Sequence, residues 1–317
     1  MNHLSVSVII PTYNRQALTL RAVRSVLAQS YRDFELIVID DGSIDDLSPV
    51  CDLVRSNGHQ FFRTENRGVA AARNKALSLT HGNWVALLDS DDHWLPEKLE
   101  TQVRFHQKNP ACQVSQCEED WYRSGKRVTR EQRHAPAAGD AFARSCQLCC
   151  VSSSSVMLRR TIFTECGGYD ERLPACEDYD LWLRVTSRYE VGLVPEKLVE
   201  KYGGHSDQLS KRYPVMDRFR VFSLLKLVVS SELSSDQQKL ALTELRKKVE
   251  ILAQGATKRG QPISTYYEAL IRAVDSCLSF DVNPSFVLIP FLEAGVDLIG
   301  HSYPNQPHNI YSLGQFP

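Results

Sequence analysis

The chain has 317 residues, with 37 Lys and Arg against 38 Asp and Glu, so its formal net charge is −1. This balance argues against a protein that binds the nucleic-acid backbone, because such binding needs many uncompensated Lys and Arg side chains. Hydrophobic residues make up 43% of the chain and charged residues 24%. These are ordinary values for a globular protein, and they exclude collagen, a disordered chain and a coiled coil.

Three features of the chain concern its compartment. The N-terminus leads directly into the apolar segment Val6–Ile10, without the flanks of a signal peptide, so we expect no leader. No segment reaches the roughly 18 consecutive apolar residues of a membrane span, and the nearest, Phe286–Ile299, contains Glu293 and Asp297. The nine cysteines are an odd number without a dense disulfide framework. We therefore expect a cytoplasmic protein.

The N-terminal third of the chain alternates short β-branched segments with amphipathic helices, the pattern of βαβ units in a parallel sheet. We predict strands at Val6–Ile10, Phe34–Ile39, Gln60–Arg63 and Trp84–Leu88, and helices at Ala17–Gln29, Asp46–Arg55 and Val69–Leu79. A polar cluster follows each predicted strand. Because ligands of open α/β sheets bind beyond the carboxyl ends of the strands, we expect these clusters to line one crevice.

Further along the chain the alternation of strands and helices becomes less regular, and the C-terminal part is predicted to be helical. We predict a helix from Glu97 to about Lys108, mixed short strands through Val128, a strand near Ser154–Leu158, and a helix at Glu177–Ser187. After Tyr213 helix-forming residues dominate, and the predicted helices are Val215–Ser230, Asp236–Gln254, Pro262–Leu278 and Pro284–Ile299. We therefore divide the chain into an α/β domain over residues 1–213 and a C-terminal helical region over residues 214–317.

The segment Asp89-Ser90-Asp91-Asp92 places three carboxylates directly after an apolar strand. Carboxylate oxygens together with phosphate oxygens are the usual ligands of Mg²⁺ or Mn²⁺. Asp is also common in turns and helix caps, so Asp92 could instead cap the helix expected next. Taken alone, the segment fits both interpretations.

Five segments in order carry a resemblance: Pro11–Arg15, Asp40–Ser43, Asn66–Asn74, Asp89–Asp92 and Glu177–Arg184. Together they resemble family 2 glycosyltransferases, which have the GT-A fold and transfer a sugar from a nucleotide-sugar with inversion. The resemblance covers Val6 to about Ser210 and none of the helical tail. It implies a Rossmann-like mixed α/β sheet flanked by helices, with a helical extension.

The resemblance also implies roles for the donor. Pro11, Tyr13 and Asp40 would hold the nucleoside, and Arg73 would reach the base or the pyrophosphate. Asp89 would contact the ribose or a metal-bound water. Asp91 would ligate Mn²⁺ or Mg²⁺, and His205 would ligate the metal or contact the pyrophosphate. Each of these residues also has an interpretation without a role in binding: a common turn, a solvated arginine on a helix, or an exposed histidine in a loop.

An inverting transfer needs a base that takes the proton of the acceptor hydroxyl. The family places this base at the second position of the Glu177-Asp178 pair, so Asp178 is the predicted catalytic residue. Glu177 and Trp182 are candidate donor or acceptor contacts. The alternative is that these acids only complement the helix dipole and that Trp182 lies in the core.

We therefore expect a metal-dependent enzyme that moves a sugar from a UDP- or dTDP-sugar to the hydroxyl of a saccharide or lipid-linked saccharide, in the synthesis of a surface polysaccharide or glycolipid. An inert nucleotide-sugar-binding or scaffold protein of the same fold is the alternative from another class, and a nucleotidyltransferase is the alternative enzyme. The tail could dock at the inner membrane surface, mediate self-association or pack on the α/β domain.

Overall fold

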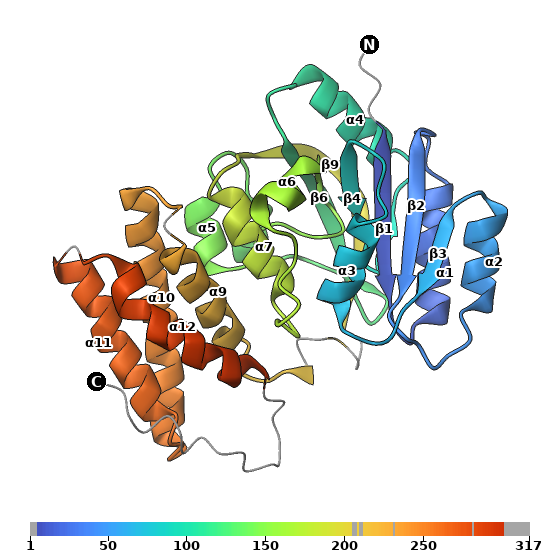
Figure 1. Cartoon of the computed structure of the whole chain (residues 1–317). Helices are drawn as coiled ribbons and strands as arrows, with labels where there is room; N and C mark the ends of the chain where they lie inside the picture. Colours follow the sequence, from blue (N-terminus) through green and yellow to red (C-terminus); the bar gives the residue numbers. More distant parts are fainter. Residues whose placement is uncertain (1–4, 205–207, 209–211, 231, 281, 301–317) are drawn as a thin grey trace. The chain divides into compact units, whose positions relative to one another are not determined.

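The computed structural model describes residues 5–204, 208, 212–230, 232–280 and 282–300 (Figure 1). His205, which the resemblance assigns to the metal or pyrophosphate, lies outside these residues. Contacts divide the chain into two compact units. The first unit comprises Met1–Ala141, Cys149–Glu171 and Arg188–Ser206, and the second comprises Phe142–Leu148, Arg172–Ser187 and Asp207–Pro317.

The first unit is built on one mixed sheet. Within the described residues it has nine strands, in the order β3-β2-β1-β4-β8-β6-β9-β5, with β7 paired to β6. The strands are β1 (Val6–Thr12), β2 (Phe34–Asp40), β3 (Gln60–Arg63), β4 (Trp84–Leu87), β5 (His93–Trp94), β6 (Val114–Arg123), β7 (Lys126–Val128), β8 (Met157–Arg159) and β9 (Val191–Gly203). Strands β1 to β4 are parallel, as predicted, whereas β8 runs antiparallel to β4 and β6.

Helices cover both faces of this sheet, so its central strand β1 is buried along its whole length. Every residue of β1 is buried, which is typical of a parallel strand covered on both faces. The helical segments of the first unit are α1 (Gln16–Leu27), α2 (Ser48–Ser56), α3 (Val69–Leu77), α4 (Lys98–Lys108), the 3₁₀ turn η1 (Gln132–His134) and α6 (Thr161–Cys166). Helix α3 lies on the opposite face from α1 (Figure 1).

The connection through α3 reverses the direction in which strands are added to the sheet. Strands β1, β2 and β3 are added in one direction, and α3 then returns the chain across the sheet so that β4 pairs with the other side of β1. Four buried alanines of α3, Ala70, Ala71, Ala72 and Ala76, let the helix approach the sheet closely. The carboxyl ends of β1 and β4 therefore form a topological switch point, where ligands of α/β sheets bind.

The second unit is helical. It contains α5 (Phe142–Gln147), α7 (Glu177–Thr186), α9 (Asp217–Val229), α10 (Ser235–Lys258), α11 (Ser264–Phe280) and α12 (Pro284–Gly300). The four predicted tail helices are confirmed to within a few residues at each end. Helix α10 begins with a capping box, in which the Ser234 side chain accepts from the Gln237 N–H and the Gln237 side chain accepts from the Ser234 N–H.

Two earlier segments, α5 and α7, belong to this helical unit. Lys248 of α10 donates to the carbonyl of Gln147 at 2.8 Å, and Lys226 of α9 forms an ion pair with Asp180 of α7 at 2.6 Å. The compact units thus interleave along the chain, and the predicted domain boundary at residues 213 and 214 stays a prediction. Within the described residues, no helix combines the length and the apolarity that a membrane crossing requires.

Candidate functional site

The loops that follow β1, β2 and β3 are tied together by hydrogen bonds. The N–H of Asn14 donates to Oγ of Ser43 at 2.8 Å. The carboxylate of Asp41 accepts from the N–H groups of Arg67 and Gly68 at 2.9 and 2.8 Å. Burial raises the pKa of Asp41, and these two hydrogen bonds oppose that effect. The loops are therefore fixed relative to one another without any ligand.

One glycine allows the loops after β2 and β3 to lie close together. Gly42 has a φ of +75°, and a Cβ at that position would lie 2.7 Å from the backbone nitrogen of Asn66. Any side chain there would push the loop after β2 away from the loop after β3, in addition to the strain of the left-handed backbone. The Asp-Gly pair of the sequence is thus required by a contact between loops as well as by the turn.

The loop after β4 joins the same group through two arginines. Arg73 of α3 is 4% exposed and donates to the Asp89 carboxylate at 2.7 Å. Arg15, which precedes α1, donates to the Asp91 carboxylate at 2.9 Å. A third arginine, Arg21, donates to the backbone carbonyl of Asp91. All four predicted clusters therefore converge, and Asp89 and Asp91 pair with neighbouring guanidinium groups.

The three carboxylates of the Asp89–Asp92 segment differ sharply in environment. The side chains of Asp89 and Asp91 are 31% and 14% exposed, whereas Asp92 is 2% exposed. Asp92 accepts from Ser154 Oγ at 2.6 Å and from the N–H of Tyr202 at 2.9 Å. Burial raises the pKa of Asp92 well above its usual value, and the charge of Lys201 opposes that effect.

Asp92 therefore joins this loop to β9 and does not cap a helix. The expectation of a helix cap is wrong, because His93 and Trp94 form the short strand β5, and α4 begins only at Lys98. Ser154 binds both Asp92 and Asp89, since its hydroxyl oxygen also accepts from the N–H of Asp89 at 3.1 Å.

A half-buried lysine of β9 contacts the same loop. Lys201 of β9 donates to Ser152 Oγ at 2.9 Å. Burial by itself would lower the pKa of Lys201, but the carboxylates of Glu119, Asp92 and Asp89 outweigh it and raise the pKa. Lys201 therefore stays protonated and compensates part of the acidic charge that the loop concentrates.

The predicted nucleoside contacts differ in accessibility. Tyr13 is 38% exposed, so its ring is open to a ligand, while Pro11 is buried. Pro11 lies beyond the point where β4 ends, so its missing N–H costs no hydrogen bond of the sheet. Asp40 is fully buried: Oδ1 accepts from the N–H of Ser43 at 2.9 Å, and Oδ2 lies 3.5 Å from Nε of Arg63.

Helix α7 presents one accessible carboxylate in its first turn. Glu177 and Asp180 are 4% and 1% exposed, whereas Asp178 is partly exposed. The residue before the helix, Cys176, has a φ of 62° and provides no side-chain cap. The acidic side chains of the first turn lie at the positive end of the helix dipole, and Asp178 Oδ1 accepts from the N–H of Tyr179 at 2.7 Å.

The two remaining candidates on α7, Trp182 and Glu177, are buried in this structure, at 1% and 4% exposed. For Trp182 this fits the alternative that its indole is a core residue. The roles of both residues as donor or acceptor contacts stay predictions. The burial of Trp182 follows from helical spacing, because Trp182 lies on the same face of α7 as other buried residues.

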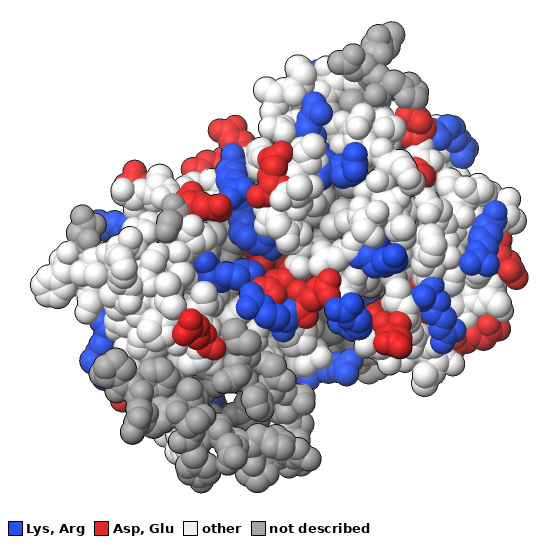
Figure 2. Space-filling model, in the orientation of Figure 1, with Lys and Arg blue, Asp and Glu red and all other residues white. Residues whose placement is uncertain are grey.

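The residues of the Asp89–Asp92 segment fit a hard divalent cation held by few protein ligands. Within the part of the chain that the structure describes, no cluster of three His, Cys, Asp or Glu side chains could hold a metal. Asp89 and Asp91 remain partly open to solvent, and Mg²⁺-like ions are commonly held by one or two carboxylates together with substrate phosphates. Figure 2 shows the charged side chains on one face of the molecule, where acidic and basic groups lie next to one another.

The fold and the converging loops define a protein of the GT-A class. The structure resembles that of S. aureus TarS 1–349 in complex with UDP-GlcNAc, with a TM-score of 0.71, 16% identity, and coverage of 99% of this chain and 93% of that chain. It also resembles a mannosyltransferase from Pyrobaculum calidifontis in complex with GDP-Man and Mn²⁺, with a TM-score of 0.55, 17% identity, and coverage of 95% and 88%. The predicted fold class is confirmed.

Sequence comparison gives the family. The glycosyl transferase family 2 model matches residues 7–167, and the chain belongs to this family, which is a family of enzymes. An uncharacterized glycosyltransferase of Rickettsia conorii is 32% identical over 200 residues, which cover 62% of this chain and 33% of the relative.

The Escherichia coli UDP-Glc:alpha-D-GlcNAc-diphosphoundecaprenol beta-1,3-glucosyltransferase WfaP is 30% identical over 186 residues, covering 58% and 70% of the two chains. The chain thus spans about a third of the length of its Rickettsia relatives. The family predicted from the five segments is confirmed.

Sequence reasoning missed several residues that shape this site: Arg15, Arg21, Ser154, Lys201 and Tyr202. Only Arg15 lay within a segment that carried a signal, the first loop, whereas Ser154 entered only as the start of the strand predicted near Ser154–Leu158. Tyr202 and Lys201 lie about 110 residues from Asp92 in sequence. No local pattern marks such a contact.

Proposed function

We propose that this protein is a metal-dependent, inverting glycosyltransferase that moves a sugar from a nucleotide-sugar to an acceptor hydroxyl. The observation that carries the proposal is the convergence of the four strand-end loops around Asp89 and Asp91, in a chain of family 2. The neighbour in complex with UDP-GlcNAc supports a uridine donor, and UDP- or dTDP-sugars are the donors proposed here.

The donor would lie against the loops after β1 and β4. The exposed ring of Tyr13 suits stacking on a flat base. Arg73 is held over the Asp89 carboxylate, so it can present its guanidinium to donor oxygens in a fixed orientation. Asp40 would act through the loop that it closes rather than by direct contact.

Asp91 and Asp89 would hold Mn²⁺ or Mg²⁺, which when bound neutralises the charge that develops on the leaving diphosphate. Arg15 already pairs with Asp91, so this guanidinium supplies the counter-charge before a cation binds. The buried Asp92 and the half-buried Lys201 keep the loop in place through their contacts with Ser154 and Ser152. The role of His205 as a further ligand stays a proposal of the sequence alone.

Asp178 would be the base that takes the proton of the acceptor hydroxyl. Its support is that it is the accessible carboxylate of the first turn of α7, between two buried acids. A catalytic base needs access to the acceptor hydroxyl and a fixed backbone. The partial exposure of Asp178 supports the first requirement, and its position in a helix supports the second.

The setting proposed is the cytoplasm, in the synthesis of a surface polysaccharide or glycolipid. All nine cysteines are free thiols, which supports a reducing compartment. The named activity of the WfaP relative supports a saccharide or lipid-linked saccharide as the acceptor class.

The test is the Asp178→Asn variant, which keeps the size of the side chain but removes its basicity. Transfer should be lost by a factor of about 10³ or more, while UDP-sugar binding measured by calorimetry stays close to that of the wild type. Asp170→Asn serves as the matched control on an acidic residue outside α7. Turnover retained by Asp178→Asn would exclude it as the base, and failure of the wild type to bind any nucleotide-sugar would favour an inert scaffold.

A further inference from the structure

The carboxylate proposed as a metal ligand, Asp91, already has a cationic partner. Arg15 donates to its Oδ2 at 2.9 Å, and the two side chains are only 18% and 14% exposed. The partners lie 76 positions apart in sequence, so the pair forms only because the loops after β1 and β4 come together. A cation that binds Asp91 therefore meets a guanidinium group at the same carboxylate.

The backbone of the loop after β4 is held by other contacts. The carbonyl of Asp91 accepts from Arg21, whose guanidinium carbon lies 3.8 Å from the ring centre of Tyr202. The carboxylate of Asp92 accepts from the N–H of Tyr202 at 2.9 Å. The Arg15 side chain can therefore leave the Asp91 carboxylate while these contacts keep the loop in place.

The backbone of Arg15 is also fixed by contacts that do not involve its side chain. The carbonyl of Arg15 accepts from the N–H and from the hydroxyl of Thr19, at 2.9 and 2.8 Å. The preceding residue, Asn14, donates its N–H to Ser43 at 2.8 Å. The guanidinium of Arg15 can thus move by rotation about the bonds of its long side chain, without any change in the loop after β1.

The other arginine that pairs with this segment is more enclosed. Arg73 is 4% exposed, donates to Asp89 at 2.7 Å and lies 5.2 Å from the ring centre of Tyr169. Arg15 is the more accessible of the two. Arg73 therefore suits a fixed contact, whereas Arg15 suits a contact that changes.

We propose that Arg15 changes partners when the donor binds: it leaves the Asp91 carboxylate when Asp91 binds the divalent cation, and it then binds the diphosphate of the nucleotide-sugar. This inference rests on the proposed function, because it concerns the metal and the donor of that reaction. Arg15 and Asp91 belong to the loops after β1 and β4, against which the donor is proposed to lie. The diphosphate is therefore a new anion beside Arg15.

Electrostatic repulsion gives the physical reason for the exchange. A divalent cation adds two positive charges beside Arg15 and Arg21, at a place where water is partly excluded. Arg21 stays on the backbone carbonyl and the ring of Tyr202, so Arg15 is the group that moves. Phosphate oxygens offer it charge-assisted hydrogen bonds in place of the one it gives up. Arg15 thus opposes the cation when no nucleotide is present and supports the nucleotide once the cation is bound.

The experiment measures three affinities of the full chain by calorimetry: for Mn²⁺ without nucleotide, for UDP with saturating Mn²⁺, and for UDP in chelator. R15Q should bind Mn²⁺ alone about threefold more tightly, because the competing charge is gone. It should bind UDP with Mn²⁺ about tenfold more weakly, because a phosphate contact is lost. In chelator Arg15 stays on Asp91, so R15Q should bind UDP within about twofold of the wild type.

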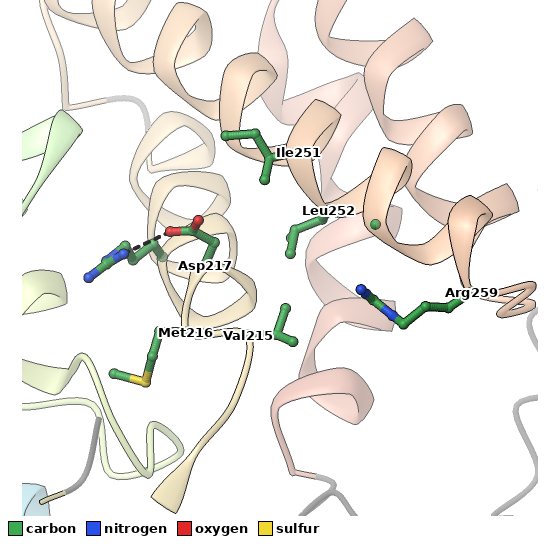
Figure 3. Close-up of a pocket in the computed structure, with 8 residues that line it drawn as sticks. Val215, Met216, Asp217, Ile251, Leu252 and Arg259 are labelled. Carbon is green, nitrogen blue, oxygen red and sulfur yellow. Dashed lines mark hydrogen bonds and ion pairs between the residues drawn. The ribbon is translucent and has the colours of Figure 1, made fainter. Parts of the chain in front are cut away.

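Three further variants serve as controls. R15K keeps the charge and should bind Mn²⁺ alone as the wild type does. R24Q removes the charge of an exposed arginine of α1 and should leave all three affinities within about twofold. R220Q removes an arginine–aspartate pair outside the site, because Arg220 pairs with Asp217 at 2.8 Å beside a pocket of the second unit (Figure 3). It should leave the three affinities equally unchanged.

The opposite signs of the two effects in Mn²⁺ make the inference easy to refute. An unchanged or lower Mn²⁺ affinity in R15Q would overturn it, because Arg15 would not compete for Asp91. Equal weakening of UDP binding in Mn²⁺ and in chelator would also overturn it, since Arg15 would then be an ordinary phosphate contact.

The wild type separates this inference from the proposed function. If the wild type binds UDP-sugars with Mn²⁺ and R15Q does not differ from it, only the exchange of partners is refuted. If the wild type binds no nucleotide-sugar, the proposed function itself fails.

Discussion

The ion pair between Lys226 of α9 and Asp180 of α7 offers the sharpest test of how the helical unit holds the proposed base. Asp180 is 1% exposed, and its two oxygens accept from Lys226 Nζ and from a guanidinium nitrogen of Arg184, each at 2.6 Å. The change is Lys226→Met, which keeps the length and the apolar stem of the side chain but removes the charge. It leaves the buried Asp180 carboxylate with Arg184 in place of two cationic partners.

The magnitude follows from this geometry. Removing one partner of a buried ion pair costs about 3–5 kcal/mol, because the other charge stays desolvated. Here Arg184 remains, and Lys226 itself is 22% exposed, so water can replace part of the lost contact. We expect the free energy of unfolding to fall by about 2 kcal/mol.

The assay is urea denaturation followed by circular dichroism, with Lys247→Met as the matched control. Lys247 lies on α10, is 61% exposed and stands 3.7 Å from Glu244, so its loss should change stability by less than about 0.5 kcal/mol. Adding Asp180→Asn to Lys226→Met should recover part of the loss, because it removes the buried carboxylate charge that has lost one of its two cationic partners. A Lys226→Met variant as stable as the control, or no recovery in the double variant, would refute the argument.

Three further predictions concern the first unit. Arg73→Met should weaken UDP binding about tenfold in a calorimetric titration, because the guanidinium held on Asp89 is lost; an unchanged affinity would place Arg73 outside the donor site. Asp91→Asn should weaken UDP binding in Mn²⁺ but not in chelator, and equal affinities in both would remove Asp91 from the metal ligands. Burial lowers the pKa of Lys98 to about 7, from 10.5 in the unfolded chain, so the unfolded state holds more protons between these values and stability should rise with pH there. Lys98→Met should remove a slope of up to about 1.4 kcal/mol per pH unit between pH 7.5 and 9 in urea titrations, and parallel curves for the two proteins would contradict this.

The sequence by itself determined the elements and the edge of the sheet where the site lies. Alternating β-branched segments and helical periodicity predicted β1 to β4 and the helices between them within a few residues. These signals are local, because each depends on the spacing of apolar residues within one element. The position of the polar clusters directly after the strands then followed from the rule for parallel sheets.

Only the tertiary structure decided which side chains of those clusters are open to a ligand. Asp89, Asp91 and Asp92 are equivalent in the sequence, but contacts with Ser154 and β9 bury Asp92 and leave the other two partly exposed. In the same way, packing turns Trp182 inward and leaves Asp178 partly exposed on the same helix. Such contacts join residues far apart in the chain, and burial depends on which surfaces the whole fold brings together, so no local pattern can encode them.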